Sequence, residues 1–217
     1  TASTTGIGEA SARLFVAEGA KVILHGMERD LGEKILADLG SSAFLHCNDL
    51  GQPNAARDLI EASVKHFGRL DGIVNNAATT RRATLEETDP AMFDFVININ
   101  LRAPLLLIRA ALPYLKAARG SVLNVGSVNA YSGASNLVPY SISKGGLMTL
   151  TRNAASSLNQ YRIRVNQLNV GWTLTEGEHR IKLTEGKGEG WLAEAVATRP
   201  FGRLLEPPDI AYAAAYF

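Results

Sequence analysis

Tyr140 and Lys144 stand four positions apart, and Ser127 precedes the tyrosine by 13 residues. On a helix, a spacing of four places two side chains on the same face. A phenol has an ordinary pKa of ~10 and is a poor base near neutral pH, but a neighbouring ammonium lowers that pKa. The phenol can then exchange a proton with an alcohol or a carbonyl compound while the serine hydroxyl holds the substrate oxygen. The alternative is that the segment YSISK simply begins an amphipathic helix.

A glycine-containing loop lies at the start of the sequence. Residues 1–8, TASTTGIG, precede a segment with apolar residues at helical spacing. Such a loop lets backbone N–H groups approach a pyrophosphate at the positive end of a helix. A plain tight turn before a helix is the other interpretation. Ala2 occupies the position of the first glycine of a dinucleotide-binding loop, and alanine fits there if its φ angle is negative.

Longer helical patterns alternate with short runs rich in β-branched residues. The helical patterns cover 6–18, 28–39, 53–67, 89–118 (with a bend near Pro104) and 140–161, and the extended runs cover 21–24, 42–46, 70–75, 121–125 and 162–168. This alternation predicts an α/β fold: a three-layer, doubly wound parallel sheet of the Rossmann type with helices on both faces. Ser127 then lies at the carboxyl end of a strand, where parallel sheets bind their ligands.

Composition narrows the class of protein. The 217 residues contain 22 Lys and Arg against 21 Asp and Glu, so the formal net charge of +1 argues against a nucleic-acid binder. A single cysteine, Cys47, excludes an intramolecular disulfide and a cysteine cluster for zinc. No apolar run approaches the ~20 residues of a membrane helix, and no signal peptide is visible. We therefore expect a single domain over residues 1–217 in the cytoplasm, with no membrane partner.

Together these motifs resemble the short-chain dehydrogenase/reductase family, of the compact single-domain type, over essentially the whole length. The loop at 1–8 is similar to that family's T-G-x-x-x-G-x-G, and Tyr140 with Lys144 to its Y-x-x-x-K pair. The resemblance implies an NAD(P)-dependent oxidoreductase that interconverts a secondary alcohol and a carbonyl by hydride transfer. It allows two alternatives, a reductase of 3-oxoacyl thioesters and a catalytically silent dinucleotide-binding regulator.

The resemblance also implies a role for each catalytic residue. Tyr140 is the general acid/base, and Lys144 tunes it and hydrogen-bonds the nicotinamide ribose. Ser127 orients the substrate oxygen. Asn100 holds a water in a proton relay with Lys144. Without the family, the expected role of Asn100 is that of a buried amide bonded to the backbone.

The implied cofactor site consists of loops that follow the predicted strands. Its residues are Thr1, Ser3, Thr5, Gly6, Ile7, Gly8, Gly26, Met27, Asp49, Leu50, Asn76, Ala77, Ala78, Gly171, Thr173 and Thr175, together with Tyr140 and Lys144. Three positions depart from the family pattern: Ala2 and Ala78 replace glycine, and Val170 replaces proline. These departures concern the tightness of cofactor binding and not the type of reaction.

The choice between NAD and NADP depends on the residues after the strand at 21–24. An acid at Gly26 would accept hydrogen bonds from the adenosine ribose and favour NAD, but it is missing. Met27 and Thr5 stand where NADP-preferring relatives often carry a basic residue. Arg29 can reach a phosphate and Glu28 a hydroxyl, although solvated loop charges are commoner. The sequence leans slightly to NADP.

Substrate choice is expected to depend on a loop or lid at about 172–198, which is charged and rich in glycine. Its character suits a polar substrate such as a sugar, polyol or hydroxy acid. Candidate contacts there are Trp172, His179, Arg180, Lys182 and Trp191, and packing within the lid is the commoner role for each of them. The resemblance further implies a homotetramer or homodimer formed through the helices near 89–118 and 140–161.

The two ends of the sequence lead to one more expectation. A dinucleotide-binding loop of this kind follows a strand, yet the sequence starts at the loop, and Phe217 lies within a helical pattern. In a doubly wound sheet that first strand is central. We therefore expect the first and last strands to lie outside the given residues, in a chain of about 250–265 residues.

Overall fold

Five strands and nine α-helices alternate along the chain in the computed structural model, which describes residues 1–217. The strands are β1 (Val22–Gly26), β2 (Ala43–Cys47), β3 (Gly72–Asn75), β4 (Ser121–Ser127) and β5 (Arg164–Val170). The helices are α1 (Gly6–Ala17), α2 (Arg29–Leu39), α3 (Ala55–Phe67), α4 (Pro90–Ile97), α5 (Ala103–Ala118), α6 (Val138–Leu158), α7 (Glu176–Thr184), α8 (Trp191–Ala197) and α9 (Pro207–Tyr216). Each predicted helix and strand is present, with ends that move by a few residues.

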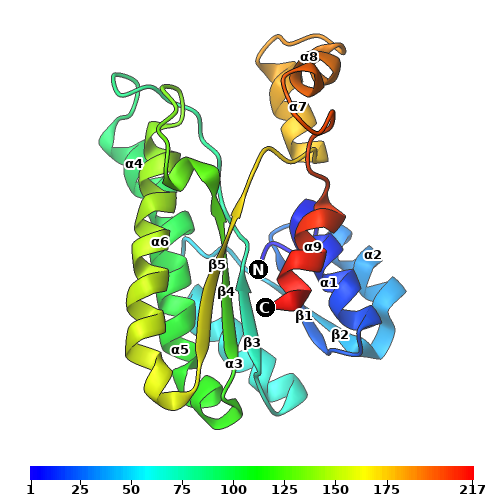
Figure 1. The fold of residues 1–217 in the computed structure, drawn as a ribbon. Helices are drawn as coiled ribbons and strands as arrows, with labels where there is room; N and C mark the ends of the chain where they lie inside the picture. The colour runs from blue at the N-terminus through cyan, green and yellow to red at the C-terminus, as the bar shows by residue number, and fades with distance from the viewer.

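The strands form parallel sheets with helices on both faces. β1 pairs with β2, and β3, β4 and β5 form a second sheet in that order. α3, α5 and α6 pack on one face of the larger sheet, and α1 and α9 pack on the other (Figure 1). The α/β class predicted from the alternating pattern is confirmed.

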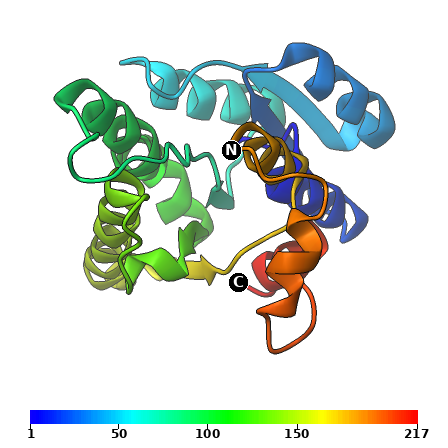
Figure 2. The ribbon, with the colours of Figure 1, turned by 90° about the horizontal axis from the view of Figure 1, so that it is seen from above.

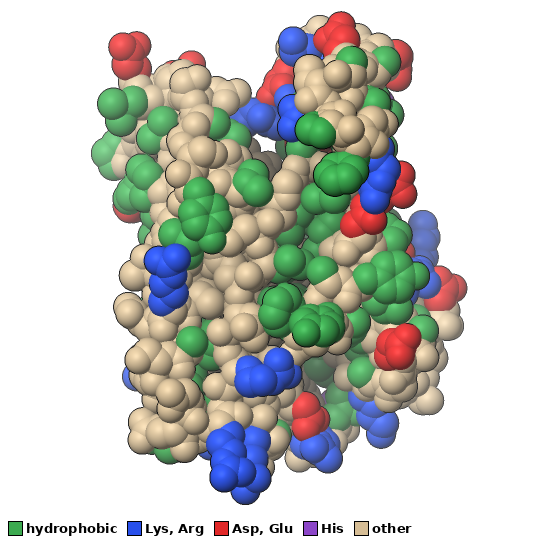
Figure 3. Space-filling view, in the orientation of Figure 1, with side chains coloured by type: hydrophobic (Ala, Val, Ile, Leu, Met, Phe, Trp, Pro, Cys, Tyr) green, Lys and Arg blue, Asp and Glu red, His purple; other side chains and the backbone are tan.

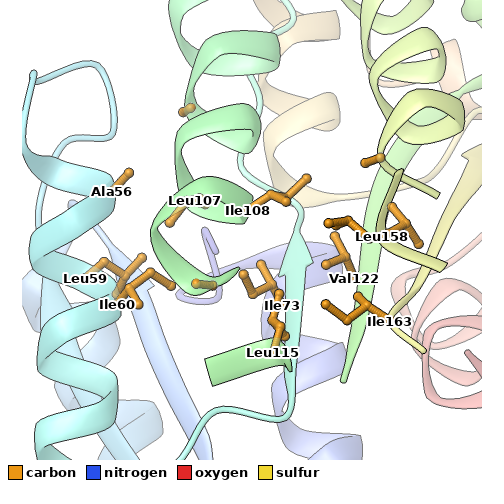
Figure 4. Packing of buried hydrophobic residues seen from close by; sticks show 14 of the residues in the cluster. Ala56, Leu59, Ile60, Ile73, Leu107, Ile108, Leu115, Val122, Leu158 and Ile163 are labelled. Carbon is orange, nitrogen blue, oxygen red and sulfur yellow. The ribbon is translucent and has the colours of Figure 1, made fainter. Parts of the chain in front are cut away.

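The main core lies between the larger sheet and α3, α5 and α6. Leu59 and Leu107 from the helices meet Ile73 of β3 and Val122 of β4 there (Figure 4). β4 is apolar on consecutive positions because helices cover both of its faces. Because β4 is packed on both faces, the position of Ser127 at its carboxyl end is fixed.

A cavity of about 720 Å³ separates the two sheets. Ile23 of β1, Val74 of β3 and Leu123 of β4 are among its lining residues, so the walls are largely apolar. The loop before α1 crosses the gap: the backbone N–H of Ser3 donates to the carbonyl of His25 at 2.6 Å. The single doubly wound sheet expected from sequence is thus divided into two sheets over residues 1–217.

α4 and α5 are joined by a π-helical turn at Asn98–Arg102. Asp89 begins α4 by accepting a hydrogen bond from the backbone N–H of Met92 at 2.7 Å. The bend predicted near Pro104 corresponds to this wider turn, because proline has no N–H to continue the regular helical hydrogen bonds before it. The turn buries Asn100, which is 1 % exposed.

The continuous helical stretch Pro90–Ala118 has the length and the mean hydropathy, 1.5, of a membrane-crossing helix. Counting uninterrupted apolar residues had predicted no such segment. Within the fold, Leu107, Ala111 and Leu115 from this stretch are buried against the sheet and α3. The same apolar composition therefore serves a core helix here.

The segment after β5 folds into α7 and α8, which project beyond the carboxyl edge of the larger sheet (Figure 1). Seen from above, they lie across that edge from α4 (Figure 2). Trp191, Ala195 and Leu204 form a small core of their own. Apolar periodicity did not predict α7 because none of its residues is buried. Its sequence signal is the cap, where the Thr175 hydroxyl accepts from the backbone N–H of Glu178.

Candidate active site

The predicted site residues gather at the carboxyl ends of the strands. β1 ends at Gly26 and β4 at Ser127, while Asn76 and Gly171 directly follow β3 and β5. Because all strands within each sheet are parallel, their carboxyl ends share an edge. Tyr140 lies in the first turn of α6, beside the same edge. Segments far apart in the sequence therefore meet at one place.

Tyr140, Lys144 and Ser127 are brought together as the sequence predicts. The Lys144 ammonium lies 5.7 Å from the centre of the Tyr140 ring and donates to the carbonyl of Val125 on β4 at 2.7 Å. The Ser127 side chain lies close enough to Tyr140 to act on the pKa of the phenol, and it accepts from the backbone N–H of Asn129 at 3.2 Å. Phenol, hydroxyl and ammonium thus lie on two adjacent elements, β4 and α6.

The pKa of Tyr140 is raised above its ordinary value of 10.0. Burial is the largest cause, and the carboxylate of Glu178 adds to it, while the hydrogen bond with Ser127 acts in the opposite direction. From residue types alone, the ammonium of Lys144 was expected to lower this pKa. Lys144 is not among the causes of the shift, and burial dominates because desolvation penalises the phenolate directly. At neutral pH the phenol is therefore protonated and ready to donate to a carbonyl oxygen.

Lys144 is a buried cation. Its side chain is 3 % exposed, and burial lowers its pKa from 10.5 to about 8. The group therefore stays charged at pH 7, at a cost in desolvation that the Val125 carbonyl offsets only in part. A cation kept in such a place at the expense of stability is typical of a functional site.

Asn100 is held by the backbone of the loop after β3. Its Oδ1 accepts from the N–H of Thr79 at 2.8 Å, and its Nδ2 donates to the carbonyl of Thr79 at 2.9 Å and to Ser143 Oγ at 3.0 Å. Ser143 Oγ donates in turn to the Tyr140 carbonyl at 2.6 Å. This is the buried, backbone-bonded amide expected without the family. Its role in a proton relay stays a prediction.

The glycine-containing loop is tied to the end of β3. The hydroxyl of Thr1 accepts from the backbone N–H groups of Asn76 and Ala77 at 3.0 and 2.9 Å. The Asn76 amide donates to the carbonyls of Thr1 and Ala2 at 3.0 and 3.1 Å. Thr1 and Asn76, both predicted as cofactor residues, therefore shape the loop through their own side chains.

Ala2 adopts a φ of 48°, in the left-handed region. The sequence-based condition for alanine at this position, a negative φ, is not met. Its N–H donates to the ring nitrogen of His25 at 3.2 Å, which helps to hold the strained turn. The Cβ of a residue other than glycine is costly in this region of φ.

We expect Ala2→Gly to stabilise the protein by about 1 kcal/mol, because glycine removes the penalty of the left-handed turn. Urea unfolding of the two proteins measures the difference. Ala10→Gly, inside α1, is the matched control and should lose a similar amount, because glycine weakens a helix interior. An Ala2→Gly protein that is less stable than the original would contradict the inference that Ala2 is strained by its positive φ.

Of the residues predicted to contact the adenosine of the cofactor, some have structural contacts of their own. A Cβ at Gly26 would overlap the side chain of Thr4, and Met27 is 66 % exposed. Asp49 closes a turn by accepting a backbone N–H two residues on, at 2.8 Å. Leu50 is 6 % exposed and belongs to the main core. Contacts of these residues with an adenosine stay predictions, and Leu50 has an evident structural role.

Comparison with known proteins agrees with this geometry. A family model described as enoyl-(acyl carrier protein) reductase matches residues 1–217. L-fucose dehydrogenase of Bos taurus is 31% identical over 217 residues, which is 100% of this chain and 80% of that protein. Trans-4-hydroxycyclohexanecarboxylate dehydrogenase of Sinomonas cyclohexanicum is 32% identical over 215 residues, covering 94% of this chain and 78% of that protein. The chain belongs to the short-chain dehydrogenase/reductase family.

Solved structures of family members have the same fold. A 3-ketoacyl-(acyl-carrier-protein) reductase from Brucella melitensis, complexed with NADH, superposes with a TM-score of 0.87 and 29% identity over 99% of this chain and 86% of its own. A second short-chain dehydrogenase/reductase from that organism gives 0.89 at 28% identity, over 99% and 85% of the two chains. The Rossmann-type fold is therefore confirmed. This family member is an NAD(P)-dependent oxidoreductase of alcohols and carbonyls.

The loop before α1 fits a dinucleotide of this kind. Thr5 caps α1 without a side-chain hydrogen bond, so its side chain does not occupy the first N–H groups of the helix, which carry its positive end. Gly8 cannot carry a Cβ, because the carbonyl of Ala2 lies against it. Thr5, Gly6 and Thr175 help to line a cavity of about 850 Å³ between α1 and α7. Among the remaining predicted cofactor residues, Ile7 lies in the first turn of α1, and the loops at the same edge hold Ser3, Ala78, Gly171 and Thr173.

Arg82 and Glu178 were not singled out from the sequence. The guanidinium of Arg82, on the loop after β3, donates to both carboxylate oxygens of Glu178 on α7, at 3.1 and 3.2 Å. The signal that could have found Arg82 is its place in a loop after a buried strand, where an arginine has no packing role. Glu178 lies 96 residues away in sequence, so nothing local indicates the pair.

Proposed function

We propose that Tyr140 is the general acid/base of this oxidoreductase and that its substrate is a polar secondary alcohol or the corresponding carbonyl compound. The observation that carries the catalytic part is the joining of Tyr140, Ser127 and the buried ammonium of Lys144 at the carboxyl edge of the sheet. A catalytically silent regulator that only binds a dinucleotide would have little reason to keep all four of Asn100, Ser127, Tyr140 and Lys144.

In this proposal Ser127 holds the substrate oxygen beside the phenol. In the reducing direction Tyr140 donates its proton to that oxygen, and in the oxidising direction it removes the proton. Lys144 keeps a positive charge behind the phenol and hydrogen-bonds the nicotinamide ribose. A bound nicotinamide supplies or accepts the hydride, which is the redox step. The protein contributes alignment and placed hydrogen bonds.

The polar character of the substrate is supported by the lid and by the relatives. Charged groups lie where the lid meets the loop after β3: Glu178 and Lys182 are on α7, and Arg82 is on that loop. The relatives named above are called dehydrogenases of L-fucose and of trans-4-hydroxycyclohexanecarboxylate. We therefore expect hydroxylated sugars, polyols and hydroxy acids to be better substrates than apolar alcohols.

Titration of NAD, NADP and their reduced forms, followed by a substrate screen, tests the proposal. The screen holds sugars, polyols, hydroxy acids, their oxidised forms and an acetoacetyl thioester. Turnover of a polar alcohol supports the proposed substrate class. Turnover of the thioester alone would favour the 3-oxoacyl reductase, the activity named for the similar Brucella structure. Binding of the dinucleotide without any turnover would favour the silent regulator.

The contacts of Glu28 lead us to propose NAD as the preferred cofactor, although the sequence leans to NADP. The Thr4 hydroxyl donates to the Glu28 carboxylate at 3.1 Å, which places this carboxylate beside Gly26, where the usual acid is missing. A carboxylate there accepts from a ribose hydroxyl and repels a 2′-phosphate. Arg29 pairs loosely with Glu33 on its own helix, at 3.7 Å. The similar Brucella reductase is itself a complex with NADH.

Calorimetric titration measures this preference without turnover. The unchanged protein should bind NADH at least about tenfold more tightly than NADPH. Glu28→Gln should narrow that ratio, mainly by tightening NADPH, because the repelling charge is gone. Glu61→Gln, at an exposed position of α3, should leave the ratio unchanged. Tighter binding of NADPH by the unchanged protein would support the preference for NADP instead.

Assembly as a homotetramer or homodimer and a cytoplasmic location stay predictions. The proposed contact helices carry exposed apolar side chains, with Phe95, Leu105 and Ile142 exposed by 42 %, 47 % and 49 %. Apolar groups on neighbouring helices are typical of an interface. Sedimentation analysis measures the assembly directly.

A further inference from the structure

Arg82 makes every hydrogen bond and ion pair that joins residues 172–198 to the chain before residue 171. Its Nη2 donates to both oxygens of Glu178, and its Nε lies 2.7 Å from Glu185 Oε1, although this N–H does not point at that oxygen. Glu178 and Glu185 belong to α7 and the residue that follows it. One guanidinium therefore links two carboxylates of the lid to the body of the protein.

Within the lid, the two carboxylates are joined to each other through Lys182 and to Trp172. Lys182 lies between the two carboxylates, 2.7 Å from Glu185 and 3.8 Å from Glu178. The indole N–H of Trp172 donates to Glu178 Oε1 at 2.8 Å. Two cations and two anions leave the network neutral, and the four charged side chains are only 12–30 % exposed. Such shielded networks are less screened than isolated surface pairs.

The body side of the network is equally fixed. Ala83, next to Arg82, forms a parallel bridge with Leu137. Its carbonyl accepts from the N–H of Val138 at 3.1 Å, and its N–H donates to the carbonyl of Asn136 at 3.0 Å. These residues lead directly into α6 and Tyr140. Arg82 is thus anchored within the loops that build the catalytic end of α6.

Packing alone gives α7 little hold on the body. None of its residues is buried, and its connection to α8 runs through the indole of Trp191, which donates to the His179 ring at 3.0 Å. Charged side chains gather where α7 and α8 rise above the rest of the surface (Figure 3). Backbone hydrogen bonds with Leu205 fix the base of the lid at Trp172 and Leu174, and the contacts to Arg82 are the polar restraint on α7 itself.

We propose that Arg82 is a positioning residue that holds α7 over the active site by pairing with Glu178 and Glu185. Substrate enters and leaves when these pairs open, and they re-form when the lid closes. The charge of Glu178 already acts on the phenol of Tyr140, which places the lid carboxylate near the reacting group. By pairing with that carboxylate, Arg82 holds it in this place.

The groups around the phenol predict the electrostatic consequence of losing Arg82. Lys144 acts from the helix of Tyr140 itself, Ser127 from β4, and Glu178 from α7. Lys182 and Glu185 lie behind Glu178. Without Arg82 the lid is released, and Glu178 moves away from the phenol. The pH dependence of alcohol oxidation should then shift to lower pH, since a nearby carboxylate raises the pKa of a phenol.

Tryptophan fluorescence tests the positioning without any turnover. The protein has two tryptophans, Trp172 and Trp191, and both lie in the lid. Arg82→Met should increase their quenching by acrylamide, and Arg82→Lys should restore part of the protection. Arg81→Met is the matched control, because Arg81 lies over the ring of Phe95 and makes no hydrogen bond or ion pair to the lid. Circular dichroism confirms that each variant is folded.

Kinetics complete the test, and this part rests on the proposed function. Arg82→Met should raise KM for the substrate several-fold with a smaller change in kcat, and Arg81→Met should not. The double variant Arg82→Met with Glu178→Gln should show less than the sum of the two effects. Unchanged quenching in Arg82→Met would overturn the proposal even if the enzyme turns over normally. Increased quenching with unchanged KM would show that the lid does not position substrate, which overturns it as well.

Discussion

Tyr140→Phe is expected to lower kcat by about 10³-fold, the range in which general acid/base groups contribute. The substitution removes one oxygen and keeps the ring, so the packing of α6 should remain intact. Ser127 keeps the hydrogen bond that it accepts from the N–H of Asn129, and the buried Lys144 keeps its bond to Val125. Steady-state turnover of the best substrate from the screen measures the effect.

Two controls make this result specific to the proton transfer. Titration of the reduced dinucleotide should show that Tyr140→Phe changes the Kd by no more than a few-fold, far less than the loss in kcat, because the glycine-containing loop and Lys144 are left in place. The rate of alcohol oxidation by the unchanged protein should rise with pH, because the phenol must lose its proton and its pKa is raised. A variant that keeps more than about a tenth of the turnover would show that another group moves the proton.

Lys144→Met is expected to abolish turnover and to stabilise the protein at pH 7. Burial lowers the pKa of Lys144 from 10.5 to about 8, which corresponds to about 3 kcal/mol of unfavourable free energy for the charged form. Loss of the hydrogen bond to Val125 costs about 1 kcal/mol. Urea unfolding at pH 7 should therefore give a variant that is about 2 kcal/mol more stable.

The stabilisation should depend on pH in a defined way. Below pH 8 both the folded and the unfolded protein carry the proton, so the cost of burying the charge is fully present. Between about 8 and 10.5 the folded state has lost its proton and the unfolded state has not, so the unchanged protein gains stability with pH. Above 10.5 the advantage of the variant should disappear. Lys65→Met, at an exposed position of α3, should show no such dependence.

A Lys144→Met protein that is less stable than the original at pH 7 would contradict this account. It would mean that the hydrogen bond from Lys144 to Val125, and the packing around it, outweigh the desolvation of the ammonium. Stabilisation that persists unchanged at high pH would also contradict it. In that case the gain would come from the apolar side chain of methionine and not from the removal of a buried charge.

Local patterns predicted most of the fold. β4 could be recognised because a strand covered on both faces is apolar at consecutive positions, and α3 because its buried residues recur at helical spacing. The same rules missed α7, which has no buried residue and therefore no periodicity. Its local signals were the Thr175 cap and the charges at its ends, acidic in the first turn and basic in the last.

The grouping of the candidate catalytic residues was predictable because their spacing is a local property. Tyr140 and Lys144 share a helix face at four residues apart, and Ser127 ends a recognisable strand. The direction of the Tyr140 pKa was not predictable, because it depends on burial and on Glu178, which tertiary folding brings near. The φ of Ala2 and the pairing of Arg82 with Glu178 also depend on contacts between distant segments.

Transfer of deuterium from the dinucleotide to the substrate tests directly whether the protein catalyses hydride transfer with Tyr140 as its general acid/base. Reduced dinucleotide with deuterium at both C4 positions of the nicotinamide is incubated with the protein and a ketone from the screen, and the product is analysed by mass spectrometry. Direct hydride transfer at the Tyr140 site predicts one deuterium on the carbinol carbon of the product, formed by the unchanged protein and largely lost in Tyr140→Phe. Product without deuterium, or equal labelled product from Tyr140→Phe, would contradict it.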